Sequence, residues 1–226
     1  MNQPETARGD AVKADAQQIL TFMITEHSAL QTARGSTIFE ANGRTTLYLS
    51  SVSSALVALA FVGQMSEMGQ AFLLFGLLLF PTLFFIGLVT FVRVLETALE
   101  DMRYALEINR IRHYYTEIAP QMARYFLQST HDDMRGMQEG LGMVLPRGQL
   151  WLTTAGMVSV VNSVLLGVFV SMLVTAFIET SIGIVIALGV VTFVVSVLLH
   201  TRYQRVAWEK AMQQIKPLFP SPSTRE

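Results

Sequence analysis

The amino-acid sequence predicts an all-α polytopic membrane protein, with four transmembrane helices in two antiparallel hairpins and cytoplasmic helical extensions. Three observations predict this fold class: an apolar composition, four long apolar blocks and the placement of the basic residues. Hydrophobic residues make up 51% of the 226 residues and charged residues 15%, whereas typical soluble domains carry about 25% charged residues. The formal net charge of −1 gives no case for nucleic-acid binding.

The four apolar blocks cover residues 45–63, 71–92, 150–178 and 181–201, and none of them contains Lys, Arg, Asp or Glu. A helix needs about 20 mostly apolar residues to cross a ~30 Å hydrocarbon core. The first block is the weakest, because four serines lie in its first half, but serines in a span can bond to their own backbone and to neighbouring helices. The first 18 residues are polar, so we expect no secretory signal peptide and a first span that is retained.

The basic residues set the expected orientation. All 16 Lys and Arg residues lie outside the two short connections, residues 64–70 and 179–180. The positive-inside rule then places both termini and the middle segment in the cytoplasm, with the chain in the cell (inner) membrane and the lipid bilayer as its surroundings. The expected segments are 1–44 (cytoplasmic, with an amphipathic helix), 45–92 (hairpin 1), 93–149 (cytoplasmic helices), 150–201 (hairpin 2) and 202–226 (cytoplasmic helix and tail).

The cytoplasmic segments show helical patterns. Residues 11–40 carry an apolar stripe, and Asn42-Gly43 is a turn signal that predicts an elbow before the first span. The helix before the elbow could lie on the membrane surface or in solvent. The second span is expected to continue to about Ile118, with coiled-coil spacing that includes Asn109 and predicts pairing with residues 11–40 or with a second subunit.

The chain beyond this helix has clear breaks. Ala119-Pro120 should end the helix, because proline lacks an amide donor and disfavours helix in the residue before it. A further helix is expected over about 121–139, followed by a glycine-rich return to the third span. A last helix over about 202–215 should precede a loose tail that contains three prolines.

Small and hydroxyl-bearing residues recur every four positions in the third span. The row consists of Ala155, Ser159, Ser163, Gly167, Ser171 and Thr175, and the first span has a shorter row at Ser50, Ser54 and Ala58. Such rows let helices pack closely, so leucine at Ser163 or Gly167 should disrupt assembly or folding. The alternative is that the hydroxyls line a wet path, and Asn162 beside the row favours it, because a mid-membrane amide should face protein or water.

Three further features bear on a pore. The phenylalanine-rich second span is expected to face lipid, with Pro81 as a kink and candidate hinge. Glu67 and Glu179 lie in the outer connections, where a symmetric assembly would form carboxylate rings at a pore mouth that favour cations. A single subunit with two hairpins encloses little space, so we expect a homo-oligomer.

The densest basic and aromatic patch is the run from residue 109 to 115. Its candidate binding residues for anionic lipid, a nucleotide or an acidic partner surface are Arg110, Arg112, His113, Tyr114 and Tyr115. A solvated helix face is the simpler alternative. Residues 130–133, with the sequence Thr-His-Asp-Asp, are interpreted as a helix cap or turn and not as a metal site.

Two functions fit these patterns. One is a homo-oligomeric channel or pore lined by the first and third spans, which the hydroxyl rows and Asn162 favour. The other is a non-conducting membrane anchor, adaptor or sensor whose residues 94–145 bind a partner or ligand. The absence of cysteine and of any catalytic or phosphate-binding motif argues against an enzyme, and no catalytic residue, cofactor or metal is predicted.

Overall fold

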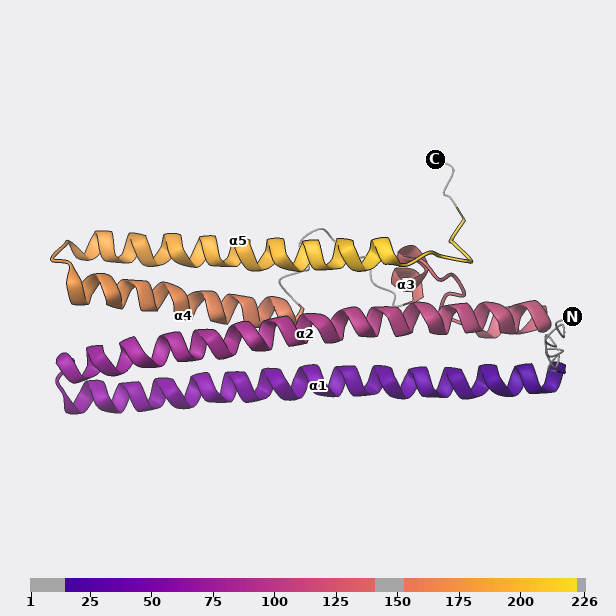
Figure 1. Ribbon diagram of the computed structural model, residues 1–226, viewed down its shortest axis with the longest axis horizontal. Helices are drawn as coiled ribbons and strands as arrows, with labels where there is room; N and C mark the ends of the chain where they lie inside the picture. The colour runs from indigo at the N-terminus through magenta and orange to yellow at the C-terminus, as the bar shows by residue number, and fades with distance from the viewer. Residues whose placement is uncertain (1–14, 141–152, 223–226) are drawn as a thin grey trace, which may run out of the picture.

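The computed structural model describes residues 15–140 and 153–222, and this part of the chain is helical without strands. The four long helices are α1 (Ala16–Met65), α2 (Gln70–Ile118), α4 (Thr154–Phe177) and α5 (Ile182–Gln214). Two short elements, η1 (Pro120–Tyr125) and α3 (Met134–Gly140), lie between α2 and α4. All four long helices are long and apolar enough to cross a membrane. The predicted all-α class and the two antiparallel hairpins are therefore confirmed (Figure 1).

Helix α1 runs without a break for 50 residues, or about 75 Å at 1.5 Å per residue. Asp15 caps it, because its carboxylate accepts a hydrogen bond from the Gln18 amide at 2.7 Å while the Gln18 side chain accepts one from the Asp15 amide. The elbow predicted at Asn42-Gly43 is wrong. A helical glycine costs only about 1 kcal/mol, and α2 supports α1 along both sides of this pair.

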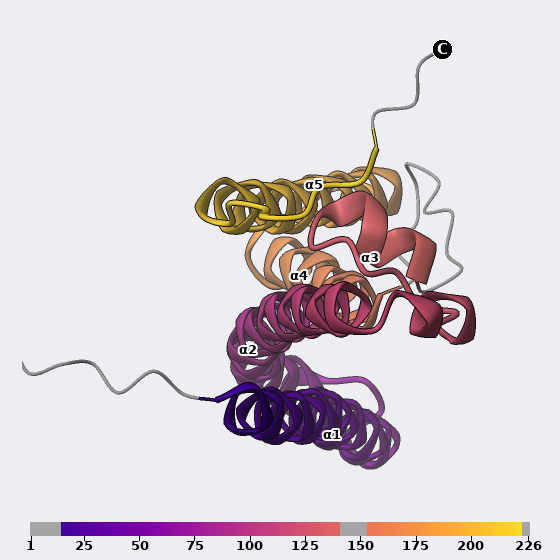
Figure 2. The same ribbon diagram turned by 90° about the vertical axis from the view of Figure 1, so that its right-hand side faces the viewer.

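The long helices form one layer in the order α1, α2, α4, α5 (Figure 2). Helix α2 is therefore internal to the layer, and the part of the second span that is expected to face lipid is limited to the side that its neighbours leave uncovered. Phe80 and Phe91 are buried in the core between the helices, whereas Phe85 remains exposed. Helices α1 and α5 are the edges of the layer, and each has a long apolar face that no other described part of the chain covers.

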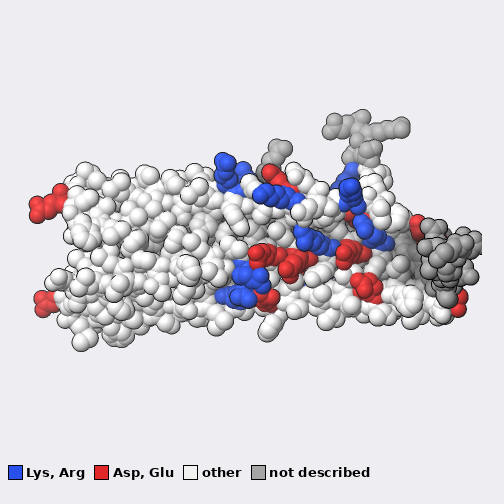
Figure 3. Space-filling model, in the orientation of Figure 1, with Lys and Arg blue, Asp and Glu red and all other residues white. Residues whose placement is uncertain are grey.

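The charged residues divide the molecule into two halves (Figure 3). One half has no charged side chains except at its very end, in the α1–α2 and α4–α5 connections. From Thr45 to Met65, α1 has 21 uncharged residues, about 32 Å, which matches a hydrocarbon core of about 30 Å. This is the architecture of a multi-pass membrane protein.

Outside the apolar half, α1 and α2 continue as a packed pair. Leu30 of α1 packs with Ile108 and Ile111 of α2, and Arg34 forms an ion pair with Asp101 at 2.8 Å. This face of α2 is not the predicted coiled-coil stripe: Met102 and Leu106 of the stripe pack with Met137 of α3 and Ala211 of α5, so the predicted pairing of the stripe with residues 11–40 is wrong. The polar position of the stripe, Asn109, is buried and donates a hydrogen bond to the His131 carbonyl.

The segment after α2 departs from the predicted helix over 121–139. Helix α2 does end at Ile118, as predicted, but η1 and a non-helical stretch follow it. Asp133 then accepts a hydrogen bond from the Gly136 amide at 2.7 Å, which is a capping contact that starts the short helix α3. The glycine-rich return and the expected start of the third span at residue 150 lie outside the described residues.

Candidate functional site

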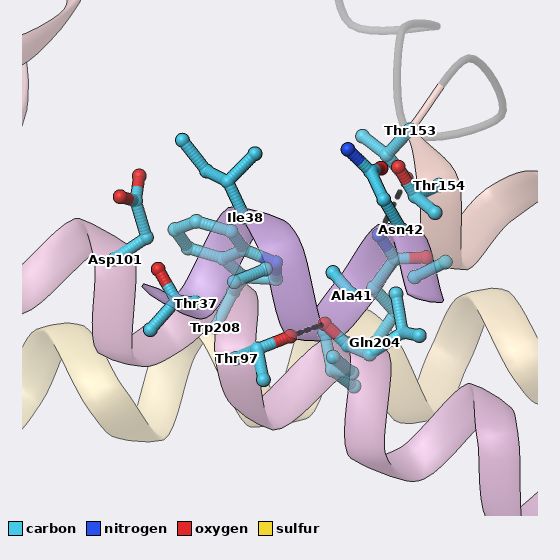
Figure 4. Close-up of a pocket in the computed structure, with 14 residues that line it drawn as sticks. Thr37, Ile38, Ala41, Asn42, Thr97, Asp101, Thr153, Thr154, Gln204 and Trp208 are labelled. Carbon is cyan, nitrogen blue, oxygen red and sulfur yellow. Dashed lines mark hydrogen bonds between the residues drawn. The ribbon is translucent and has the colours of Figure 1, made fainter. Parts of the chain in front are cut away.

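A cavity of about 460 Å³ lies where the apolar half meets the charged half, and all four long helices contribute to its wall. Its polar side chains are those of Thr37, Asn42, Thr97, Asp101, Thr153, Thr154, Gln204 and Trp208. Figure 4 shows Asn42, Thr153 and Thr154 at one end of the cavity and Asp101 at the other. The cavity therefore lies at the boundary between the membrane spans and the charged half of the molecule.

The wall of this cavity combines polar side chains with apolar ones such as Ile38, Val94 and Leu95, and it is nearly neutral. Its acid, Asp101, already accepts hydrogen bonds of 2.8 and 3.1 Å from Arg34. Gln204 is buried and donates to the Thr153 hydroxyl at 3.4 Å. The Thr37 and Thr97 hydroxyls donate to the backbone carbonyls of Arg34 and Val94. The arrangement can therefore hold an uncharged polar group.

The candidate pore residues of α4 lie inside the layer. Ser159 and Ser163 are buried, and the Ser163 hydroxyl is 2.9 Å from the Ser196 hydroxyl of α5. Asn162 is fully buried, where its side-chain carbonyl accepts a 3.3 Å hydrogen bond from the Tyr48 hydroxyl of α1. Their surroundings are neighbouring helices of the same chain.

Gly167 continues this packing toward the other end of α4. A Cβ atom at Gly167 would lie 2.8 Å from the Gly189 carbonyl of α5, so only glycine allows this approach of the two backbones. Ser171 is half-buried and donates a weak 3.4 Å hydrogen bond to the Val185 carbonyl, and Thr175 is exposed. Small residues on both helices thus hold the α4–α5 hairpin together.

The remaining pore candidates lie elsewhere. Ser50 and Ser54 are exposed on α1, the opposite edge of the layer from α5. Glu67 and Glu179 are exposed in the two connections at the uncharged end, and Glu67 has a left-handed backbone with φ of 50°. Pro81 is half-buried, and α2 continues as a helix on both sides of it. Within one chain, the structure does not bring the α1 serines and the α4 row onto one surface.

The basic and aromatic patch is largely used inside the chain. Arg110 pairs with Asp132 at 2.7 Å, and Arg112 donates to the Asn109 side chain at 2.8 Å. Tyr115 donates to a backbone carbonyl of α1, and Tyr114 is half-buried. Arg110 lies 17 residues beyond Arg93, about 26 Å from the end of the apolar half if the helix is followed along its axis.

The C-terminal tail is docked on this patch, so the predicted loose tail is wrong for the described residues up to 222. The fully buried Asp132 carboxylate accepts hydrogen bonds from the Leu218 and Phe219 amides at 2.9 and 2.7 Å. The Phe219 ring stacks on His113 with centroids 3.8 Å apart. The prolines prevent a helix in the tail, so the amides of Leu218 and Phe219 have no helical partners. The Asp132 carboxylate binds these amides instead.

Asp133 completes this tail contact. It accepts hydrogen bonds from both the amide and the hydroxyl of Ser221, at 2.7 and 2.8 Å. Burial alone would raise the pKa values of Asp132 and Asp133, but the hydrogen bonds to their charged forms outweigh it and lower both pKa values. The carboxylates are therefore ionised when the tail is bound, and the Asp-Asp pair is the sequence signal for this contact.

An exposed apolar surface marks the far end of the molecule. We call it the tip, and it consists of Ile118, Met122, Tyr125 and Leu127. Leu127 is fully exposed and Tyr125 is 62% exposed. The tip follows the end of α2. Ile118, Met122 and Tyr125 are spaced by four and three residues, so the sequence predicts them on one face of a helix and not as an exposed surface.

Comparison with known proteins adds no relative: no family model matches the chain, and no curated protein or solved structure matches it. The functional assignment therefore rests on the geometry described above.

Proposed function

We propose that the chain is a non-conducting membrane adaptor whose tip binds a protein partner in the cytoplasm. The tip carries this proposal. Ile118 lies 26 residues beyond Val92, the last residue of the second apolar block, which is about 39 Å of helix. Lipid around the spans does not reach that far along the helix axis. Exposed large apolar side chains in water, here with Arg124 stacked on Tyr125, favour a protein contact site.

The interior of the layer supports an adaptor more than a pore. The hydroxyls of Ser159 and Ser163 are bonded to other groups of the chain. Asn162 is bonded to Tyr48. The serine hydroxyls and the Asn162 side-chain carbonyl therefore have partners within the layer, whereas the buried Asn162 side-chain NH₂ group has none among the described residues. The basic residues support a cytoplasmic placement of the tip, because none of them lies in the two short connections between the spans.

Site-specific photo-crosslinking in intact cells tests the adaptor. A photoreactive residue at Leu127 should capture a defined partner, and a Tyr125→Asp change should reduce that capture by about tenfold or more, as for an interface anchor. The matched control places the photoreactive residue at Gln121, which is also exposed and lies near the tip but is polar. The purified partner should then bind the purified chain, and equal capture from both positions, unaffected by Tyr125→Asp, would rule the tip out.

A homo-oligomeric channel is the second candidate, and the exposed edge of α1 favours it. Ser50 and Ser54 face away from the layer there, so copies arranged in a ring could place these hydroxyls on a shared axis with Glu67 at its mouth. Ion flux into liposomes that contain the purified chain tests this candidate. A pore lined by α1 should conduct and should be blocked by Ser54→Leu, whereas silence across voltages and pH with a verified oligomer would exclude it.

A further inference from the structure

A second cavity, of about 910 Å³, lies on the surface of the layer and is open to the side. We call it the α2–α5 groove. Its walls include Phe84 and Leu88 of α2 and Val191 and Val195 of α5, and Leu166 of α4 contributes between them. It exists because α2 and α5 pack on α4 but scarcely touch each other.

The inner wall of the groove is mostly apolar, and two hydroxyls and the His200 ring also lie in it. His200 Nδ1 lies 2.8 Å from the Ser196 carbonyl, and its buried Nε2 has no hydrogen-bond partner among the described residues. Both hydroxyls are satisfied within the chain. Thr192 donates to the Leu188 carbonyl at 2.8 Å, and the Ser196 hydroxyl is 2.9 Å from that of Ser163. A polar ligand would find no free partner among these hydroxyls, whereas a hydrocarbon chain loses nothing by lying against them.

The end of the groove toward the charged half is basic. Arg202 lines it and is exposed, and it forms no hydrogen bond or ion pair within the described residues. The positions one turn away on α5 hold apolar residues and Arg205, so no acid of the same helix neutralises it. Tyr203 lies beside it in the groove wall, and tyrosine side chains are enriched at the headgroup level of membranes.

The groove has the length of one leaflet. Val191 and Arg202 are 11 residues apart on α5, or about 17 Å. Half of a ~30 Å hydrocarbon core is about 15 Å. A lipid acyl chain that starts at Arg202 and follows the groove would thus end near the bilayer midplane.

We propose that the α2–α5 groove binds one anionic phospholipid, with an acyl chain along the groove and its phosphate at Arg202. The apolar wall contacts the acyl chain of the lipid. The guanidinium of Arg202 supplies the charge complementarity, since basic pockets between membrane helices bind anionic headgroups. This site is independent of the proposed adaptor function, because it lies on the spans and not at the tip.

Native mass spectrometry of the purified full chain tests the site, with phosphatidylglycerol and phosphatidylcholine of identical acyl chains as probes. The wild type should retain phosphatidylglycerol in preference. Arg202→Gln should lower that retention about fivefold, because one basic residue near a membrane surface contributes about 1 kcal/mol to anionic binding. Arg205→Gln, outside the groove wall, should change it by less than about twofold.

A second pair of variants tests the groove itself. Val195→Trp fills it and should reduce retention of both lipids, whereas Val194→Trp, at a neighbouring position of similar exposure (46% against 49%), should not. Equal retention of the two lipids by the wild type would overturn the proposal and indicate bulk lipid only. Equal effects of the two arginine variants, or of the two tryptophan variants, would overturn it as well.

Discussion

The docked tail is the contact whose energy is best defined by the geometry, and Asp132→Asn tests it. The Asp132 carboxylate accepts hydrogen bonds from two tail amides and from Arg110, all between 2.7 and 2.9 Å. Asparagine has the same shape but retains only one acceptor oxygen, so its NH₂ group must face a donor. Hydrogen bonds to charged groups contribute about 1.5–3 kcal/mol each, and the Arg110 partner is 38% exposed, so the tail amides carry most of the loss.

A loss of about 3 kcal/mol lowers the ratio of docked to free tail by roughly 150-fold, which is enough to detach a short segment. The chain has no cysteine, so cysteines at Glu107 and Leu218 can carry two spin labels without background. The wild type should give one narrow distance between the labels, and Asp132→Asn a broad distribution. Glu100→Gln removes an exposed acid of α2 without a described partner and should leave the distance unchanged. A narrow distance in Asp132→Asn would refute the reasoning.

Three further predictions follow from the packing, the titration and the layout of the chain. Gly167→Leu should destabilise the α4–α5 hairpin by about 1–3 kcal/mol or more through overlap with an α5 backbone carbonyl, whereas Val168→Leu at an exposed position should not; equal thermal unfolding of the two variants would contradict this. The pKa values of the two carboxyls that bind the tail are lowered, so their contribution is complete above the ordinary carboxyl pKa of about 4 and is lost as the pH falls below it. The label distance should therefore stay narrow from pH 7 to 5 and broaden below about pH 4; broadening already at pH 6 would contradict this. Cysteines at Glu67 and Glu179 should react with an impermeant maleimide from outside intact cells, and reaction only from the cytosol would reverse the orientation.

Local patterns predicted the elements of the fold well. The four spans follow from uninterrupted apolar length, and the end of α2 at Ile118 follows from Pro120. The elbow at Asn42-Gly43 was wrong because a turn signal expresses a weak backbone preference. Packing of α1 on α2 on both sides of the pair outweighs that preference.

The arrangement of the helices could not be read from the same patterns. The small-residue row of α4 indicated close packing, but not that its partner is Gly189 and Ser196 of α5 in the same chain. Likewise, the sequence pattern indicates that Arg110 is a binding residue, but it does not identify Asp132 as its partner. Both contacts join residues far apart in sequence, and spacing along one helix does not specify them.

Because α1 and α2 are continuous helices, a tilt of their membrane-spanning parts also moves their ends outside the membrane. A helix that is longer than the local bilayer thickness adjusts by tilting, and a straight rod carries that tilt to its far end. Over about 39 Å of helix, a tilt of about 5° displaces the end by roughly 3 Å. A change in membrane thickness would thus move the surface formed by Tyr125 and Leu127 by a distance comparable to a hydrogen bond, without any bending of the chain.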